Sequence, residues 1–221
     1  MVFPSLRSGR YVRPSLTLIA AGGYFGAPSA KTLESFSLIC ITGQMAAGKN
    51  YICSQLEKEG WLSTDLDQTA HKAIELCREE ILTAFKGEAE KLGIEIENPD
   101  SSINRRNLGR LLFKNPALLA RQESIIYPKI IELTKEFIAR NAGKKIIINA
   151  TVLYKTPQLL ELCQAVVFVT APFLTRLRRA RRRDHLPLRQ ILRRFWAQKD
   201  LLARYKEAAA PKIPLIIVKN N

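Results

Sequence analysis

A glycine-containing loop between a buried strand and a helix constrains the fold of this chain more than any other feature. The apolar run Leu38–Ile41 has the length and composition of a buried strand, and Gly43, Gly48 and Lys49 follow it. These residues fit the phosphate-binding loop pattern G-x-x-x-x-G-K-[ST] at every position but the last, where Asn50 stands. A strand, loop and helix of this kind predict an α/β fold with a polyphosphate ligand.

The composition of the loop suits binding of phosphate by backbone amides. Gly43 permits a tight turn, and Gly48 allows a close approach to the ligand before the helix begins. Lys49 adds a positive charge, and the N-terminus of the helix points to the same place. We therefore expect the nucleotide contacts to come from seven neighbouring residues: Gly43, Ala46, Ala47, Gly48, Lys49, Asn50 and Tyr51.

Two carboxylates follow the second expected strand, at the edge where a doubly wound sheet opens its ligand crevice. One of Asp65 and Asp67 could accept a proton from an attacking hydroxyl, while the other organises Mg²⁺. Helix capping is the alternative role, because Asp is favoured at helix N-termini. Asn50 could offer Mg²⁺ an amide oxygen in place of the usual hydroxyl. We expect Asp65, Asp67 and Lys49 to be catalytic, and Asn50 and Asp65 to hold the metal.

Arginines are concentrated after the fourth expected strand. Residues 171–221 hold fourteen basic and three acidic residues of a chain whose net charge is +15. Segments 173–183 and 187–206 read as two helices, and Arg179 and Arg183 share one face of the first. Such a pair suits a lid that brings cations to a transferring phosphoryl group. A solvated basic face and a nucleic-acid surface are the alternatives, but interleaved aromatics are scarce. We assign Arg179 to the nucleotide and Arg183 to catalysis.

The rest of the chain alternates strands with helices, which predicts a parallel sheet covered on both faces. The five expected strands are short apolar runs bounded by turn signals, at 38–42, 61–64, 145–149, 165–170 and 214–218. Residues 68–140 form an inserted helical region, with helices expected at 68–86, 104–113 and 116–140. With the Arg-rich lid at 173–206, these elements make one domain at 35–221.

Residues 1–34 do not have the pattern of a folded domain. They are rich in Arg, Ser, Gly and Pro, and they hold no acid before Glu34. An organelle transit peptide, a secretory signal ending near Ala30 and translation from an upstream false start are the three interpretations. We favour a disordered or spurious extension, because a chain that uses intracellular ATP has little reason to be secreted.

Cysteine usage indicates a reducing compartment. The four cysteines lie far apart, with no C-x-x-C, at Cys40, Cys53, Cys77 and Cys163. This spacing argues against a zinc site or a disulfide framework and predicts a cytoplasmic protein. No apolar stretch is long enough to span a bilayer, so we expect no membrane partner.

Several of these segments, taken in order, resemble the dephospho-coenzyme A kinase family. The similarity runs from about Leu38 to Asn220. The matching pieces are Thr42 through Asn50, Asp65-Leu66-Asp67 with Ala70-His71, Asp100 through Leu108, Arg179 through Asp184 with Gln198, and Ile217 through Asn220. Asn50, Asn149, Tyr127-Pro128 and Thr151 through Lys155 depart from the family pattern.

The resemblance implies transfer of the ATP γ-phosphoryl group to the ribose 3′-hydroxyl of dephospho-coenzyme A, with Mg²⁺ as cofactor. It implies a phosphate-loop kinase domain in which the inserted helices hold the substrate. It also makes Asp67 the base and places Asn220 at the nucleotide. The partners are then two small molecules, without nucleic acid or membrane. Another small-molecule phosphate-loop kinase, a non-catalytic nucleotide-binding descendant and a nucleic-acid-associated ATPase are the alternatives.

Overall fold

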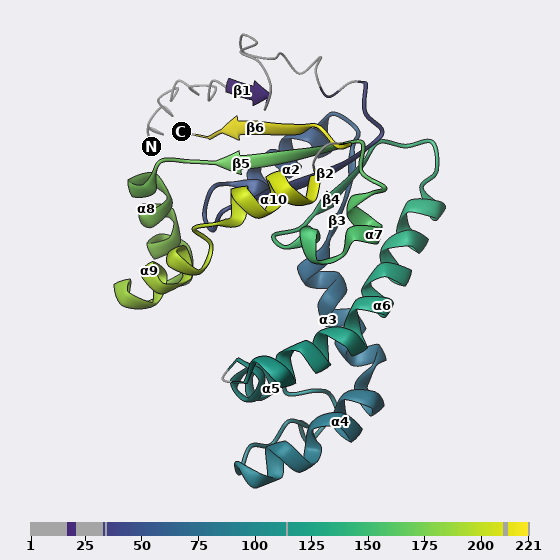
Figure 1. Ribbon diagram of the computed structural model, residues 1–221, viewed down its shortest axis with the longest axis vertical. Helices are drawn as coiled ribbons and strands as arrows, with labels where there is room; N and C mark the ends of the chain where they lie inside the picture. The colour runs from purple at the N-terminus through teal and green to yellow at the C-terminus, as the bar shows by residue number, and fades with distance from the viewer. Residues whose placement is uncertain (1–16, 21–32, 34, 114, 210–211, 221) are drawn as a thin grey trace, which may run out of the picture.

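The computed structural model describes residues 17–20, 33, 35–113, 115–209 and 212–220. The described chain forms a twisted sheet from which a long helical arm and a shorter helical pair extend (Figure 1). The arm is made of the inserted region, and the pair carries the Arg-rich segment. No helix in this part of the chain is both long and apolar enough to cross a bilayer.

The expected parallel sheet of five strands is present. Its strands are β2 (Leu38–Gly43), β3 (Leu62–Asp65), β4 (Ile146–Asn149), β5 (Ala165–Thr170) and β6 (Leu215–Lys219). The order β6-β5-β2-β4-β3 places β2 at the centre, so the loop that leaves β2 opens at the middle of the sheet. This is the position at which a doubly wound sheet binds its ligand.

The sheet has one strand more than expected. β1 (Thr17–Ala20) pairs antiparallel with β6 and forms the edge of the sheet. It comes from residues 1–34, which the sequence predicts to be an extension outside the domain. Most of that segment lies outside the described residues, so its assignment as an extension stays a prediction.

Both faces of the sheet are buried, as the nearly continuous apolar strands require. On β2, Cys40 faces a core shared with the helical arm, while Ile39 and Ile41 face a second core. The second core is closed by α2 (Lys49–Lys58) through Ile52, Cys53 and Leu56. The helix that begins at the glycine loop is therefore fixed to the sheet by its apolar side.

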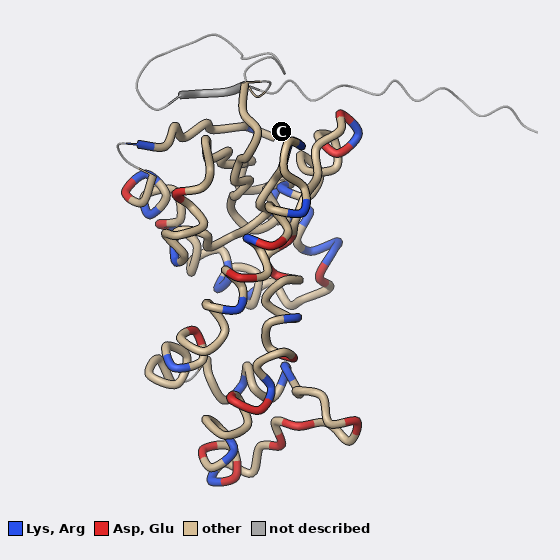
Figure 2. The backbone as a smooth tube through the Cα atoms, turned by 90° about the vertical axis from the view of Figure 1, so that its right-hand side faces the viewer, with Lys and Arg blue, Asp and Glu red and all other residues tan. Residues whose placement is uncertain are grey.

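The helical arm contains α3 (Leu66–Leu76), α4 (Arg78–Lys91), α5 (Arg105–Leu112) and α6 (Pro116–Arg140). The sequence predicts one helix at 68–86, but the backbone leaves helical geometry at Cys77, with φ −95° and ψ 21°. This break lets α3 and α4 both pack on α6. No Gly or Pro marks the break in the sequence. Figure 2 shows charges of both signs along the arm.

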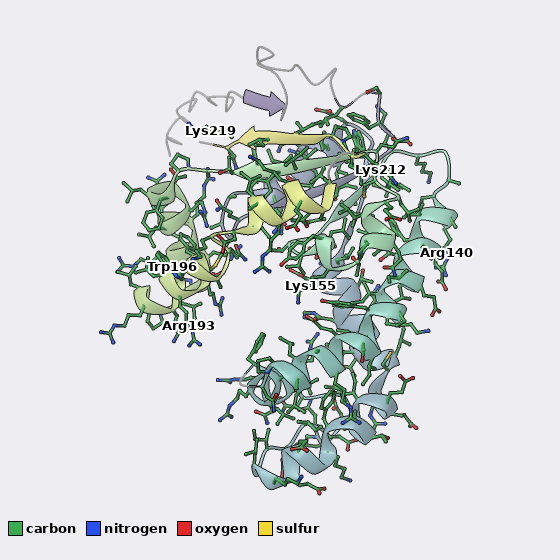
Figure 3. The ribbon with its side chains drawn as sticks, viewed as in Figure 1. Arg140, Lys155, Arg193, Trp196, Lys212 and Lys219 are labelled. Carbon is green, nitrogen blue, oxygen red and sulfur yellow. The ribbon has the colours of Figure 1, made fainter. Side chains whose placement is uncertain are left out.

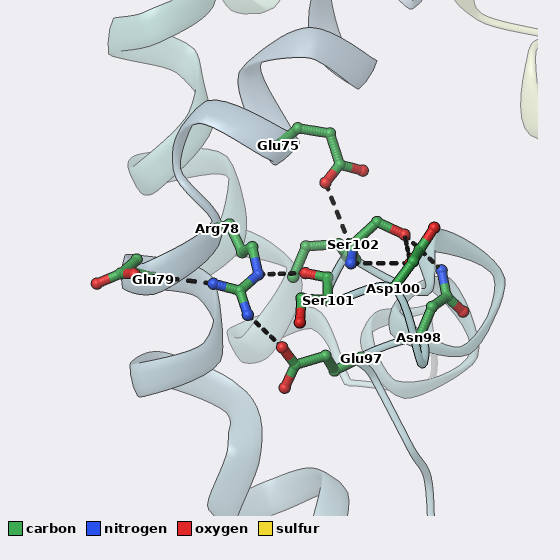
Figure 4. Close-up of polar contacts among 9 residues, drawn as sticks. Glu75, Arg78, Glu79, Glu97, Asn98, Asp100, Ser101 and Ser102 are labelled. Carbon is green, nitrogen blue, oxygen red and sulfur yellow. Dashed lines mark hydrogen bonds and ion pairs between the residues drawn. The ribbon is translucent and has the colours of Figure 1, made fainter.

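The Asp100 segment forms a turn that is fixed by its own polar groups (Figure 4). The Asp100 carboxylate accepts hydrogen bonds from the backbone N–H and the hydroxyl of Ser102, at 3.0 and 2.6 Å. Arg78 bonds the Ser101 carbonyl and pairs with Glu97, which ties the turn to α4. Asn104 then caps α5 by accepting from the Asn107 N–H at 3.1 Å. The Asp100 to Leu108 segment thus shapes the arm.

The Arg-rich segment forms α8 (Phe173–Asp184) and α9 (Leu188–Ala197). The helix predicted at 187–206 is divided, because the chain turns at Gln198 before α10 (Leu201–Ala209). α10 packs on β6 and on η1 (Leu153–Lys155), which precedes the short α7 (Pro157–Leu160). η1 and α7 have no counterpart among the elements expected from the sequence.

Candidate active site

The loop between β2 and α2 requires glycine at both ends. A Cβ atom at Gly43 would lie 2.2 Å from the Val169 carbonyl oxygen of the neighbouring strand. At Gly48, where φ is 99°, a Cβ atom would lie 2.1 Å from the Asn220 amide nitrogen. Neither site has room for a side chain, so the two glycines are needed for the packing of the loop as well as for its turns.

Hydrogen bonds hold the loop from the side of β6 and α9. The Asn220 Nδ2 donates to the Ala47 carbonyl at 2.9 Å, and the Met45 N–H donates to Gln198 Oε1 at 2.6 Å. The Ala47 N–H is bonded to the Gln44 carbonyl, and its side chain is fully buried. Ala47 and Asn220, both expected at the nucleotide, therefore support the loop in this structure.

Arg176 is a further support that the sequence analysis missed. Its side chain is buried, and its Nε and Nη1 donate to the Met45 carbonyl and to Gln44 Oε1, at 3.0 and 2.8 Å. The guanidinium also lies over the Phe195 ring, 4.3 Å from its centroid. Burial lowers the pKa of Arg176. Because it points inward from an exposed basic helix, only its place in the fold distinguishes it from the neighbouring arginines.

Replacing Arg176 with Ala is expected to destabilise the protein by about 2 kcal/mol, because two loop acceptors and an aromatic face lose their partner. Thermal or urea unfolding measures the change. Arg178→Ala is the matched control, since Arg178 lies on the same helix and is exposed. Equal stability of both variants would contradict the role given to Arg176.

The loop and α8 enclose a pocket of about 230 Å³. Its lining includes most of the residues expected at the nucleotide, together with Gln44. The lining residues are Gln44, Ala46, Gly48, Lys49, Asn50, Tyr51, Arg179 and Arg183. Of the arginines on α8 and α9, only Arg179 and Arg183 line it, while Arg193 is exposed (Figure 3). The spacing of four residues predicts that the two arginines share one helix face, and in the structure both line the pocket beside the loop.

Lys49 is held at the inner side of this pocket. Its Nζ donates to the Thr151 hydroxyl at 2.8 Å. Burial lowers the pKa of Lys49, and the nearby carboxylates of Asp67 and Asp65 partly oppose that effect. Tyr205 on α10 fixes the segment that carries Thr151, because its hydroxyl accepts from the Leu153 N–H at 2.8 Å and donates to the Thr151 carbonyl at 3.3 Å.

Asp65 has the helix-capping role that the sequence offered as the alternative. Its Oδ1 caps α3 by accepting from the Asp67 N–H at 2.9 Å, and its Oδ2 accepts from Asn149 Nδ2 at 3.4 Å. Asp67 lies in the first turn of α3 with an exposed side chain. β3 runs parallel to β2 through β4, so Asp65 at its end and Asp67 just after it lie at the edge of the sheet where the loop leaves β2.

Asn149 and Asn50 are hydrogen-bonded to each other. Asn149 Nδ2 donates to Asn50 Oδ1 at 3.1 Å, so one amide joins the loop to Asp65. Both residues depart from the pattern of the family that the sequence resembles. Their contact could not be foreseen, because it depends on the register that places Asn149 beside Asp65 in the sheet.

Arg183 forms an ion pair with the next residue in the chain. Its Nε and Nη2 donate to the two carboxylate oxygens of Asp184, at 2.6 and 3.1 Å. This pair raises the pKa of Arg183 and lowers that of Asp184. The guanidinium is thereby held at the end of α8, beside the pocket.

Known proteins resemble this chain over most of its length. Residues 37–214 match the family described as Dephospho-CoA kinase. The chain belongs to the dephospho-CoA kinase family. A Dephospho-CoA kinase of Treponema denticola is 34% identical over 202 residues, which cover 88% of each chain. That of Treponema pallidum is 34% identical over 174 residues, which cover 77% of this chain and 82% of the relative.

Solved structures support the same fold. TT1252 from Thermus thermophilus superposes with a TM-score of 0.67 at 24% identity, covering 83% of this chain and 88% of the other. Dephospho-CoA kinase from Campylobacter jejuni gives a TM-score of 0.55 at 23% identity, covering 84% and 88%. These two structures therefore share the overall fold of this chain.

Proposed function

We propose that this protein transfers the γ-phosphoryl group of ATP to the ribose 3′-hydroxyl of dephospho-coenzyme A. The observation that supports this most directly is that Lys49, Arg179 and Arg183 line one pocket. Three cations around one small pocket suit a polyphosphate, and Asp65 ends β3 at the same edge of the parallel sheet from which the loop leaves β2. Membership of the family supplies the identity of the acceptor.

In this proposal each group has a distinct task. The loop amides and Lys49 hold the phosphates, and Arg179 and Arg183 balance charge on the transferring group. Asp67 accepts the proton of the 3′-hydroxyl, because its carboxylate is exposed and Asp65 is occupied as a helix cap. Asn50 and Asp65 are the residues whose oxygens could hold Mg²⁺, which would supply charge neutralisation at the phosphates when bound.

The surrounding parts are given roles in the same proposal. The arm formed by α3 to α6 binds the acceptor, and the pair α8–α9 closes over the nucleotide. That pair already packs on the loop, because Met45 and Ala46 contact the cluster of Ala180, Ile191 and Phe195. The four cysteines are buried and free, which suits the cytoplasm.

Formation of coenzyme A from ATP and dephospho-coenzyme A tests the function. Mass spectrometry identifies the product, and a coupled assay follows ADP. A 3′-deoxy analogue of the acceptor is the control, since it offers no hydroxyl at the reacting position. ADP release that does not depend on the acceptor, or phosphorylation at another position, would contradict the proposal.

A non-catalytic nucleotide-binding role is the second candidate. The Asn50–Asn149 contact favours this role. Both side chains are neutral amides, and they occupy two positions at which a phosphate-loop kinase can use groups that organise the metal. Tight ATP binding without transfer to any acceptor would select it over the kinase.

A further inference from the structure

The Asn149 amide bridges two oxygens that could serve as metal ligands. The residue ends β4, lies opposite Asp65 in the sheet register, and is only 6% exposed. Its Nδ2 donates to Asn50 Oδ1 at 3.1 Å and to Asp65 Oδ2 at 3.4 Å. An N–H donor therefore occupies the space where a cation would contact both oxygens.

The neighbouring carboxylate fixes the orientation of this amide. An ionised carboxylate only accepts hydrogen bonds, so the NH₂ end of Asn149, and not its oxygen, must face Asp65. The same end then meets the oxygen of Asn50, and Asn50 directs its own NH₂ group elsewhere. Because both acceptors have the same partner, the two asparagines and Asp65 form a single network.

This network does not fit a divalent cation in the free protein. A cation would have to displace two hydrogen bonds and would gain one carboxylate and one neutral oxygen in return. No cluster of three or more His, Cys, Asp or Glu side chains suited to a metal is found among the described residues. Bound phosphates change this balance, because they bring several more negative oxygens to the pocket that Asn50 lines.

We propose that Asn149 is a positioning residue that makes divalent-cation binding conditional on bound nucleotide. In the free protein its amide takes the place of the cation between Asn50 and Asp65. A carboxylate at position 149 would instead lie beside that of Asp65, and two acids with the Asn50 oxygen would form a cation site without nucleotide. This inference rests on the proposed function only in assuming that the pocket binds a nucleotide.

Binding of Mn²⁺ alone tests the proposal, measured by titration calorimetry or by the loss of the free-ion signal in electron paramagnetic resonance. Asn149→Asp is expected to bind Mn²⁺ at least about tenfold more tightly than the parent protein without nucleotide, because a second carboxylate is added. With a non-hydrolysable ATP analogue present, the parent protein is expected to bind Mn²⁺ as well. Asn115→Asp is the control, since it adds the same charge at a helix cap that accepts Asp.

Thermal unfolding is a second measurement, and it also shows whether the variant folds. Mn²⁺ alone should raise the melting temperature of Asn149→Asp and leave that of the parent unchanged. If Asn149→Asp does not fold, Asn149→Ala removes the amide from between the two oxygens and should also bind Mn²⁺ more tightly than the parent protein without nucleotide. Mn²⁺ binding by the free parent as tightly as by the Asn149 variants would overturn the proposal. Failure of phosphoryl transfer would not, because these measurements need no acceptor.

Discussion

Asparagine in place of Asp67 is expected to lower turnover by roughly a hundredfold or more while leaving ATP affinity nearly unchanged. The amide has the size of the carboxylate but cannot accept a proton. Asp67 is exposed in the first turn of α3, and only its backbone N–H is used by the helix cap. The substitution should therefore remove the proposed base without disturbing the fold.

Steady-state kinetics with dephospho-coenzyme A measure this effect, with kcat and KM determined separately. Asp65→Asn is the comparison: Asn can still cap α3, but the negative charge beside Asn149 is lost. If both variants turn over the substrate at the parental rate, neither acid is the base, and the proposed mechanism is wrong.

Local sequence patterns predicted the strands of the central sheet well. β2 to β6 lie within a residue or two of the predicted runs. The inner strands β2, β4 and β5 are mostly apolar because both of their faces are buried, whereas the edge strand β3 is only half-buried. The helix breaks at Cys77 and Gln198 were missed, since neither carries Gly or Pro. At Gln198 the reason is visible, because its side chain bonds the Met45 N–H of the loop.

The parts of the candidate site that lie within a single chain segment could be predicted from the sequence. Gly48 and Lys49 follow from the loop pattern, and the i, i+4 spacing places Arg179 and Arg183 on one side of a helix. Contacts between segments were not predictable. The Lys49–Thr151 bond and the Asn149 bridge join residues about a hundred positions apart, and both depend on the pairing of β2 and β3 with β4.

Replacing Lys49 with Ala is expected to weaken ATP binding or turnover by at least about tenfold, or 1.4 kcal/mol. Lys49 is the cation that the loop itself brings to the phosphates, and its amine is already held at Thr151 Oγ1. Arg179 and Arg183 also line the pocket, but they reach it from α8. Titration calorimetry with ATP and steady-state kinetics measure the loss, and unchanged values in both would contradict the assignment of this loop.

Lys49→Met separates this effect from a loss of folding. Burial lowers the pKa of Lys49 in the folded protein, so folding disfavours the protonated amine relative to the unfolded chain. That unfavourable contribution is present at neutral pH and disappears as the pH rises through the unfolded pKa. Met keeps the apolar stem without the charge, so its melting temperature should equal or exceed that of the parent while ATP binding falls. A gain in stability with a loss of binding would show that the buried charge serves the nucleotide at the expense of the fold.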